Sequence, residues 1–248
     1  MCMLLDVPAA SFSLRQLDAI QALRSLPDAS VDLMVTDPAY ESMEKHRRIG
    51  TTTRLKRSKA SSNDWFTIFP DACFPEFFAE AYRVMKRNSH VYVFCNSDTM
   101  FVIKPIAEAA GFRFWKPIVW DKMKIGMGYH YRARYEFILF FEKGKRKLNN
   151  LGIPDVLQFA RVWRGYPTEK PVEVSDVLVR QSTQPGELVF DPFCGSGSAG
   201  VASVAAGRFF LGTDISAEAI EVTRNRLVEA GGIATDWPAP PAQSSLLG

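Results

Sequence analysis

The sequence is poor in cysteine, and it contains no long apolar run and no internal repeat. Four thiols in 248 residues do not make a disulfide scaffold, and their scattered positions exclude a C-x-x-C metal site: Cys2, Cys73, Cys95 and Cys194. No apolar run approaches the roughly 18 residues that span a bilayer, and the N-terminus lacks the basic and apolar regions of an export signal. We therefore expect a cytoplasmic protein that does not enter a membrane.

Positive charge is concentrated in two segments of the chain. Residues 41–64 carry seven Lys or Arg against three acids, and residues 122–147 carry eight against two, although the whole chain has a net charge of only +3. Its hydrophobic content of 47% is ordinary for a globular protein, so composition alone does not name a function. The two basic segments on a mildly acidic body indicate a side that faces a polyanion.

Short apolar runs alternate with helical patterns along residues 1–230, which we interpret as one α/β domain with a doubly wound, mostly parallel sheet. Strands are predicted at 12–17, 31–36, 90–95, 112–120, 135–142, 188–191 and 209–213. Helices are predicted at 15–26, 74–86, 103–110, 167–181 and 217–230. We expect 41–64 to be a mobile loop, 143–163 an irregular link and 231–248 a flexible tail.

The stretch 188–200, LVFDPFCGSGSAG, reads as an apolar strand, a glycine-rich turn and the start of a helix. Gly195, Gly197 and Gly200 let the backbone turn tightly and approach a ligand, and the helix start supplies free N–H groups. Asp191 ends this strand and Asp214 ends the next one, where carboxylates suit ribose hydroxyls or an ammonium group. A glycine turn that serves packing alone is the competing interpretation.

A second loop follows the apolar run 31–36, where the chain reads Asp37-Pro38-Ala39-Tyr40. In a parallel sheet, ligands bind outside the carboxyl ends of the strands. Asp37 and Asp191 both lie at such ends. We therefore expect the two loops to meet at one rim of the sheet.

Together these motifs resemble those of the DNA amino methyltransferases, which transfer methyl from S-adenosylmethionine to an exocyclic nitrogen of adenine or cytosine. TDPAY at 36–40 resembles their D-P-P-Y motif, and FDPFCGSGSAG at 190–200 resembles their cofactor loop. PTEKP at 167–171, WDKMKIGMGYHYR at 120–132 and LGTDIS at 211–216 also match. The order of the motifs resembles the permuted beta class with its Rossmann-like methyltransferase fold and no large separate recognition domain.

The resemblance implies a role for individual residues of the cofactor site. Phe193, Cys194, Gly195 and Gly197 would line the methionine and sulfonium part, with Asp191 and Asp37 nearby. Asp214 matches the ribose-binding acid, and Thr168 and Lys170 match the element that meets the carboxylate of the cofactor. Asp18 matches an acid that contacts the adenine of the cofactor, although a helix-start aspartate explains it equally well.

The resemblance also implies the chemistry at Asp37. Its carboxylate and the Pro38 carbonyl would accept both N–H hydrogens of the target amine, and Tyr40 would stack on a base flipped out of the duplex. No metal is needed. Aspartate rather than serine at position 37 favours adenine N6 over cytosine N4, and Ala39 replaces the usual second proline, which removes some rigidity.

The expected partner is double-stranded DNA, bound by the loops 41–64 and 122–134 with help from 145–165. The candidate DNA contacts are Arg47, Arg48, Arg54, Lys56, Lys122, Lys124, Tyr129, Tyr131, Arg132 and Arg134. The resemblance implies a nucleoid-associated enzyme and, as in many relatives, a homodimer. A partner nuclease is not indicated.

Other functions compete with this interpretation. A dinucleotide oxidoreductase would use the same glycines, but only 48 residues follow Gly200, too few for the second half of such a fold, and it leaves DPAY unexplained. A catalytically silent DNA-binding module, a cytosine-N4 methyltransferase, and RNA or a free amine as acceptor also stay open. The basic segments do not distinguish DNA from RNA.

Overall fold

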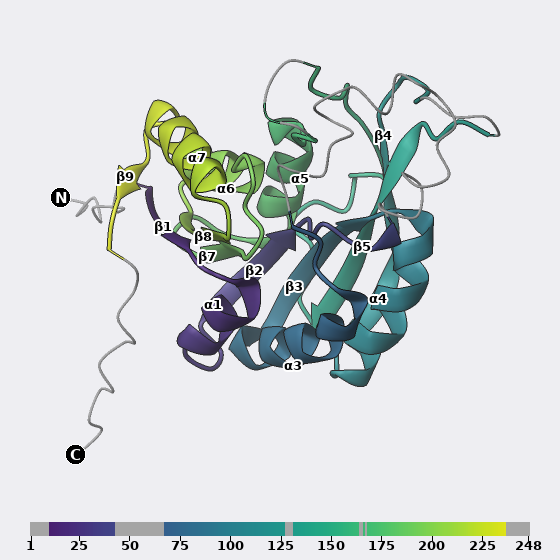
Figure 1. Cartoon of the computed structure of the whole chain (residues 1–248), viewed down its shortest axis with the longest axis horizontal. Coiled ribbons are helices and arrows are strands. Elements are labelled where there is room, and N and C mark those ends of the chain that lie inside the picture. The colour runs from purple at the N-terminus through teal and green to yellow at the C-terminus, as the bar shows by residue number, and fades with distance from the viewer. Residues whose placement is uncertain (1–9, 43–66, 127–130, 164–165, 167, 237–248) are drawn as a thin grey trace.

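The computed structural model describes residues 10–42, 67–126, 131–163, 166 and 168–236, and they fold around one nine-stranded sheet (Figure 1). The strands are β1 (Ser11–Gln16), β2 (Val31–Thr36), β3 (Met85–Cys95), β4 (Arg113–Asp121), β5 (Tyr135–Lys143), β6 (Val156–Gln158), β7 (Leu188–Asp191), β8 (Phe209–Asp214) and β9 (Ile233–Ala234). Their order in the sheet is β6-β4-β5-β3-β2-β7-β8-β1-β9. Among these strands β5 alone runs antiparallel to its neighbours, which confirms a mostly parallel sheet.

Helices cover both faces of the sheet (Figure 1). One face carries α1 (Ala19–Ser25), α3 (Phe74–Val84) and α4 (Ser97–Ala109), and the other carries α5 (Val172–Ser182), α6 (Ser198–Ala205) and α7 (Ala217–Glu229). A short 3-10 turn at Asp71–Cys73 leads into α3. Because a helix packs on each side, central strands must be apolar on both faces, and all six residues of β2 are buried. The doubly wound arrangement is thereby confirmed.

Local sequence explains the elements that lead into the sheet. In α3, apolar residues recur three and four positions apart and form one buried stripe: Phe74, Phe77, Phe78, Ala81 and Val84. The helix α4 begins earlier than its periodicity predicts, because the Asn96 side chain accepts a hydrogen bond from the Thr99 amide and caps it. Among the described residues, no helix is long and apolar enough to cross a bilayer.

Two predicted irregular segments contain short edge strands. The link 143–163 includes β6, which pairs with β4, and the segment after residue 230 includes β9, which pairs with β1. The prediction of structureless chain was wrong at these positions. Strands of three and two residues are too short to show a periodic pattern, and only pairing with the existing sheet forms them. Most of the loop 41–64 and residues 237–248 lie outside the described residues.

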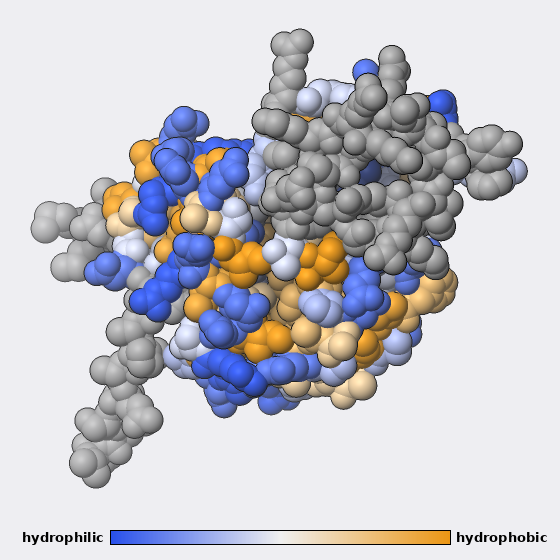
Figure 2. All heavy atoms as spheres, in the orientation of Figure 1, coloured by the Kyte–Doolittle hydropathy of each residue, from blue (hydrophilic) through white to orange (hydrophobic). Residues whose placement is uncertain are grey.

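The carboxyl end of β2 lies near the centre of the view in Figure 1, and its neighbours β3 and β7 run parallel to it, so their carboxyl ends lie at the same rim of the sheet. At that place hydrophobic side chains reach the surface, and hydrophilic side chains surround them over α1 and α7 (Figure 2). Since β5 runs in the opposite direction, its first residues, and not its last, lie at this rim. The rim therefore collects the ends of β2, β7 and β8 and the start of β5.

Candidate active site

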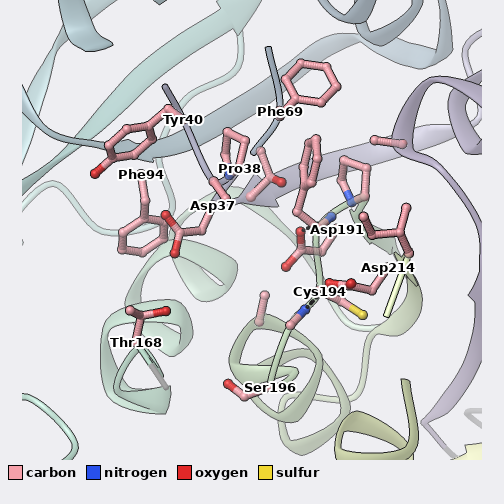
Figure 3. A pocket seen from close by; sticks show the side chains of 18 of the residues that line it. Asp37, Pro38, Tyr40, Phe69, Phe94, Thr168, Asp191, Cys194, Ser196 and Asp214 are labelled. Carbon is pink, nitrogen blue, oxygen red and sulfur yellow. Dashed lines mark hydrogen bonds between the residues drawn. The ribbon is translucent and has the colours of Figure 1, made fainter. Parts of the chain in front are cut away.

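A cavity of about 700 Å³ opens at this rim, and both sequence motifs line it. Its wall is built from the end of β2 (35–40), the turn between β7 and α6 (191–196, 198 and 199) and the end of β8 (214–216), with further residues from 67–70, 166 and 168–170. Figure 3 shows the carboxylates of Asp37, Asp191 and Asp214 pointing into the same space. The expectation that the two loops meet at one edge is confirmed.

The glycine turn is held by backbone geometry and by three side chains. Gly195 and Gly197 have positive φ angles of 50° and 78°, which residues with a Cβ rarely adopt. The Gly195 amide donates to Asp214 Oδ2 at 3.0 Å, and its carbonyl accepts from Thr223 Oγ1 at 2.8 Å. Arg226 donates to the carbonyl between the two glycines at 2.6 Å. The sequence motif predicts where the turn lies, and Thr223 and Arg226 of helix α7 hold it in place.

Gly200 serves packing. A Cβ at this position would lie 2.6 Å from the Phe210 ring and 2.9 Å from Leu227, so only glycine lets α6 approach β8 and α7 this closely. At Gly197 a Cβ would meet Thr223 at 2.6 Å, whereas at Gly195 nothing lies closer than 3.9 Å. The packing interpretation therefore holds for Gly197 and Gly200, whereas Gly195 lines the cavity and its contact with a ligand stays a prediction.

Asp191 is a buried carboxylate at the end of β7, and Asp214 is a half-buried carboxylate at the end of β8. Burial raises the pKa of Asp191 to about 8, although the Phe193 amide donates to its Oδ1 at 3.0 Å. Burial also raises the pKa of Asp214, against the hydrogen bonds that it accepts from Ser216 and Gly195. A carboxylate that burial penalises in this way is suited to a cationic ligand, which would restore the favourable charged form.

The catalytic candidate Asp37 pairs with Lys170. Lys170 Nζ lies 2.5 Å from Asp37 Oδ2 and 3.4 Å from Glu136 Oε2, and Ser198 Oγ donates to the Lys170 carbonyl at 2.6 Å. Burial raises the pKa of Asp37 and the Lys170 charge opposes that rise. Although burial disfavours the lysine charge, the two carboxylates raise the pKa of Lys170 overall. Lys170, which the sequence motif assigns to the cofactor, is thus a neighbour of the candidate catalytic carboxylate Asp37.

Glu136 is a site residue that the sequence motifs do not predict. It lies at the start of β5 and lines the cavity. Lys122 Nζ contacts its Oε1 at 2.5 Å, and Lys170 approaches its other oxygen. Burial would raise the pKa of Glu136, but the two lysines lower it overall. No residue pattern around Glu136 marks it, because its position depends on the reversed direction of β5.

Aromatic side chains enclose the space around Asp37. Tyr40 is 9% exposed, with its hydroxyl directed away from Asp37, and the Phe94 ring lies beside the carboxylate (Figure 3). The chain returns at Phe69, whose amide donates to the Ala39 carbonyl at 2.6 Å. Phe69 packs edge-on against Phe193, with ring centroids 5.1 Å apart. The segment at Phe69, 30 residues further along the chain, thus supports the loop after β2 through this hydrogen bond to Ala39.

Two predicted cofactor residues stand out by their local backbone structure: Asp18 caps a helix, and Thr168 has a left-handed conformation. Asp18 caps α1, accepting from the Ile20 amide at 2.9 Å, and it also lines the cavity. Thr168 has a positive φ of 57°, which costs a residue with a Cβ roughly 1–2 kcal/mol. Strain of this kind persists where surrounding structure enforces it, often beside a functional site. Cys194 is buried, and burial raises the pKa of its thiol.

The candidate DNA contacts are placed differently from one another. Tyr131, Arg132 and Lys124 are exposed in the segments between β4 and β5. Arg134 instead forms two hydrogen bonds to Asp121, at 2.6 and 2.7 Å, and Lys122 points inward to Glu136. Five candidates lie outside the described residues: Arg47, Arg48, Arg54, Lys56 and Tyr129.

Comparison with protein families gives a match over most of the chain. The family described as N6_N4_Mtase, DNA methylase, matches residues 31–225, which include both rim loops and Lys170. The chain belongs to this family of DNA methylases. The resemblance drawn from the motifs is thereby confirmed, and so is S-adenosylmethionine as the cofactor of the family. DNA is accordingly the substrate class of this methylase.

Individual relatives show how far the likeness extends. DNA adenine methyltransferase YhdJ of Escherichia coli K12 is 28% identical over 250 residues, covering 85% of this chain and 80% of YhdJ. The M1.HpyAVI–SAM complex has a TM-score of 0.63 at 21% identity, covering 87% of this chain and 100% of that one. The cytosine-N4-specific PvuII methyltransferase has a TM-score of 0.67 at 15% identity, covering 92% and 95%. These two structures support the methyltransferase fold.

Proposed function

We propose that this methylase transfers a methyl group to the N6 amine of an adenine that is flipped out of duplex DNA. The observation that carries the proposal is the placement of Asp37 in the same cavity as Asp191, Asp214 and the glycine turn. A base inside a duplex cannot reach a cavity of this depth, so the target must leave the stack. The cavity would hold both the flipped base and the methyl donor.

The cavity suits S-adenosylmethionine, which supplies a methyl group activated by a sulfonium charge. Gly195, Ser196 and Ser198 of the glycine turn line the cavity at the start of α6, and a Cβ at Gly195 would meet no atom closer than 3.9 Å, so a ligand can approach the backbone there. Asp191 would hold the ammonium group, because its buried carboxylate has a raised pKa and gains from a cation. Asp214 would receive the ribose hydroxyls through oxygen lone pairs that its backbone contacts leave available.

Asp37 and the Pro38 carbonyl would act on the target amine. The amine lone pair is delocalised into the base, so the nitrogen is a poor nucleophile until its hydrogens are held by two acceptors. Lys170 engages Asp37 Oδ2, and a carboxylate has enough lone pairs to accept an N–H as well. Tyr40 and Phe94 would bound the base on its flat faces.

Adenine is favoured over cytosine by the aspartate at position 37. This position in the cytosine-N4 enzymes of the family more often carries serine, and the relative YhdJ is named as a DNA adenine methyltransferase. Tyr131, Arg132 and Lys124 would contact the DNA, since they are two exposed cations and an exposed ring in the segments between β4 and β5. Arg134 and Lys122 would hold the segments that carry these residues in place, through their ion pairs with Asp121 and Glu136.

The product identifies the reaction. The protein is incubated with methyl-labelled S-adenosylmethionine and mixed-sequence duplex DNA, the DNA is digested to nucleosides, and the label is located. Labelled N6-methyladenine supports the proposal. Labelled N4-methylcytosine would overturn the base assignment. In a parallel incubation with RNA in place of DNA, label in the RNA and none in the DNA would overturn the substrate. Parallel titrations with NADH and S-adenosylmethionine separate this function from a dinucleotide oxidoreductase.

A further inference from the structure

Four charged side chains of alternating sign form a row from the sheet edge to the catalytic loop. Lys122 Nζ lies 2.5 Å from Glu136 Oε1, Lys170 Nζ lies 3.4 Å from Glu136 Oε2, and the same Nζ lies 2.5 Å from Asp37 Oδ2. The four residues come from the end of β4, the start of β5, the segment before α5 and the end of β2. We refer to this set as the charge row.

The charge row is partly shielded from bulk water. The side chains of Lys122, Glu136, Lys170 and Asp37 are 20%, 24%, 13% and 30% exposed. Lys122 Nζ lies 5.3 Å from the centre of the Trp120 ring, and Lys170 Nζ lies 5.4 Å from that of Phe94. Charges in such surroundings interact far more strongly than on the surface, so each one matters to its neighbours.

We propose that Glu136 is a positioning residue for methyl transfer, which holds Lys170 beside Asp37 and, with Lys122, keeps the charge row neutral so that the Asp37 carboxylate accepts the amine hydrogens of the target base. The proposal rests on the proposed function of Asp37. It assigns Lys170 to the acceptor side of the reaction.

Charge balance explains why Glu136 is needed. With Glu136 present, two cations face two carboxylates. Without it, two lysines face Asp37 alone, and the carboxylate is bound more firmly by cations and becomes a weaker acceptor for an amine N–H. Without Lys122 the row has an excess negative charge, and Asp37 takes up a proton more readily.

The groups around Asp37 allow these signs to be checked. The lysine charges lower the pKa of Asp37, whereas the Glu136 charge raises it, in surroundings where burial is the largest influence and raises it. The charge of Asp37 also interacts with three further titratable groups, namely Tyr40, Cys95 and Asp191. None of these three is changed in the test.

The test compares Glu136→Gln with Lys122→Met. In protein labelled with carbon-13 at the aspartate carboxyl, the Asp37 resonance is assigned by its loss in Asp37→Asn and followed against pH. We expect the apparent pKa of Asp37 to fall by about one pH unit or more in Glu136→Gln and to rise in Lys122→Met. The double variant should lie between them. Local damage to the fold would not move one carboxyl in opposite directions, so shifts of the same sign would overturn the proposal.

Kinetics test the consequence for the reaction. Glu136→Gln should lower kcat about tenfold or more, with the KM for DNA and for S-adenosylmethionine changed less than about twofold. Glu136→Asp, which keeps the charge, should recover part of the loss. Asp155→Asn is the matched control, because it removes a carboxylate from an exposed lysine pair, with Lys116 of β4 at 2.6 Å. A normal kcat in Glu136→Gln, or an equal loss in Asp155→Asn, would contradict the proposal.

The two readouts separate this proposal from the proposed function. The carboxyl titration needs no methyl transfer, so a wild-type protein that methylates nothing would refute the proposed function while the charge row is still tested. Conversely, active wild-type enzyme with an unshifted Asp37 in both variants would refute the role of Glu136 alone.

Discussion

The Lys170 ammonium lies 2.5 Å from Asp37 Oδ2, although 133 residues separate them in the chain. The contact joins the two motifs of the site, because Lys170 precedes α5 and its carbonyl is held by Ser198 at the start of α6. The glycine turn and the catalytic loop are therefore coupled through one side chain. A displacement of either loop would alter the charge next to the catalytic carboxylate.

Asp191 should make cofactor binding depend on pH. Its pKa of about 8 means that the carboxyl is largely neutral below that pH, whereas an ammonium ligand needs the carboxylate. Affinity for S-adenosylmethionine, measured by calorimetry between pH 6 and 9, should therefore rise with pH towards 8 and fall above it, where the amine of the ligand loses its proton. In Asp191→Asn the binding should be weaker, and its remaining pH dependence should come from deprotonation of the amine of the ligand. An identical pH profile in both proteins would contradict this role.

The same carboxyl should affect stability with the opposite sign. A folded-state pKa raised from about 4 to about 8 means that the folded protein binds the proton more tightly than the unfolded chain. The free energy of unfolding should accordingly fall as pH rises through that window. Denaturant titrations should show a smaller fall in Asp191→Asn. A fall of equal size in both proteins would contradict a raised pKa.

Gly197 should tolerate alanine less well than Gly186. Both have positive φ angles, 78° and 82°, so both variants bear the backbone cost of roughly 1–2 kcal/mol. A Cβ at Gly197 also meets Thr223 at 2.6 Å, whereas nothing lies within 4 Å at Gly186. Thermal unfolding should therefore show the larger loss in Gly197→Ala, and only that variant should bind the cofactor more weakly. Equal losses would show that the contact with α7 is unimportant.

Arg132 should contribute to DNA binding through its charge. It is exposed in the segment before β5, whose residue Glu136 lines the cavity, so Arg132→Glu should weaken binding and lower the salt dependence of the affinity. Arg224→Glu is a suitable control, since it reverses an exposed charge on α7. Arg134→Glu should also lower stability, because it breaks the pairing with Asp121. Binding that is unaffected by Arg132→Glu, measured over a range of salt, would place the DNA elsewhere.

The sequence predicts the part of the site that depends on parallel strands. Continuous apolar runs identify β2 and β7, and the carboxyl ends of parallel strands lie at one edge of the sheet. The sequence therefore predicts that Asp37 and Asp191 lie close together, as the pairing of β2 with β7 shows. The glycines could also be assigned to a ligand turn. Their separate packing roles at Gly197 and Gly200 could not, because the contacting Thr223 and Phe210 lie in other elements.

The rest of the site depends on the strand that breaks the parallel pattern. Glu136 begins β5, and a strand of either direction has the same periodicity, so the sequence does not show which of its ends meets the rim. The contact of Lys170 with Glu136 is not predicted from the sequence for the same reason. The domain boundaries, the homodimer and the DNA contacts of residues 43–66 stay predictions.

The most direct test of the account is single-turnover methyl transfer by Asp37→Ala, measured beside calorimetric binding of S-adenosylmethionine to the same protein. Asp37 is the proposed acceptor of the amine hydrogens, so transfer should fall by at least about a hundredfold, while cofactor affinity stays within a few-fold of wild type. Thermal unfolding shows whether the variant is folded. A folded Asp37→Ala protein that methylates DNA at a rate near that of wild type would contradict the account.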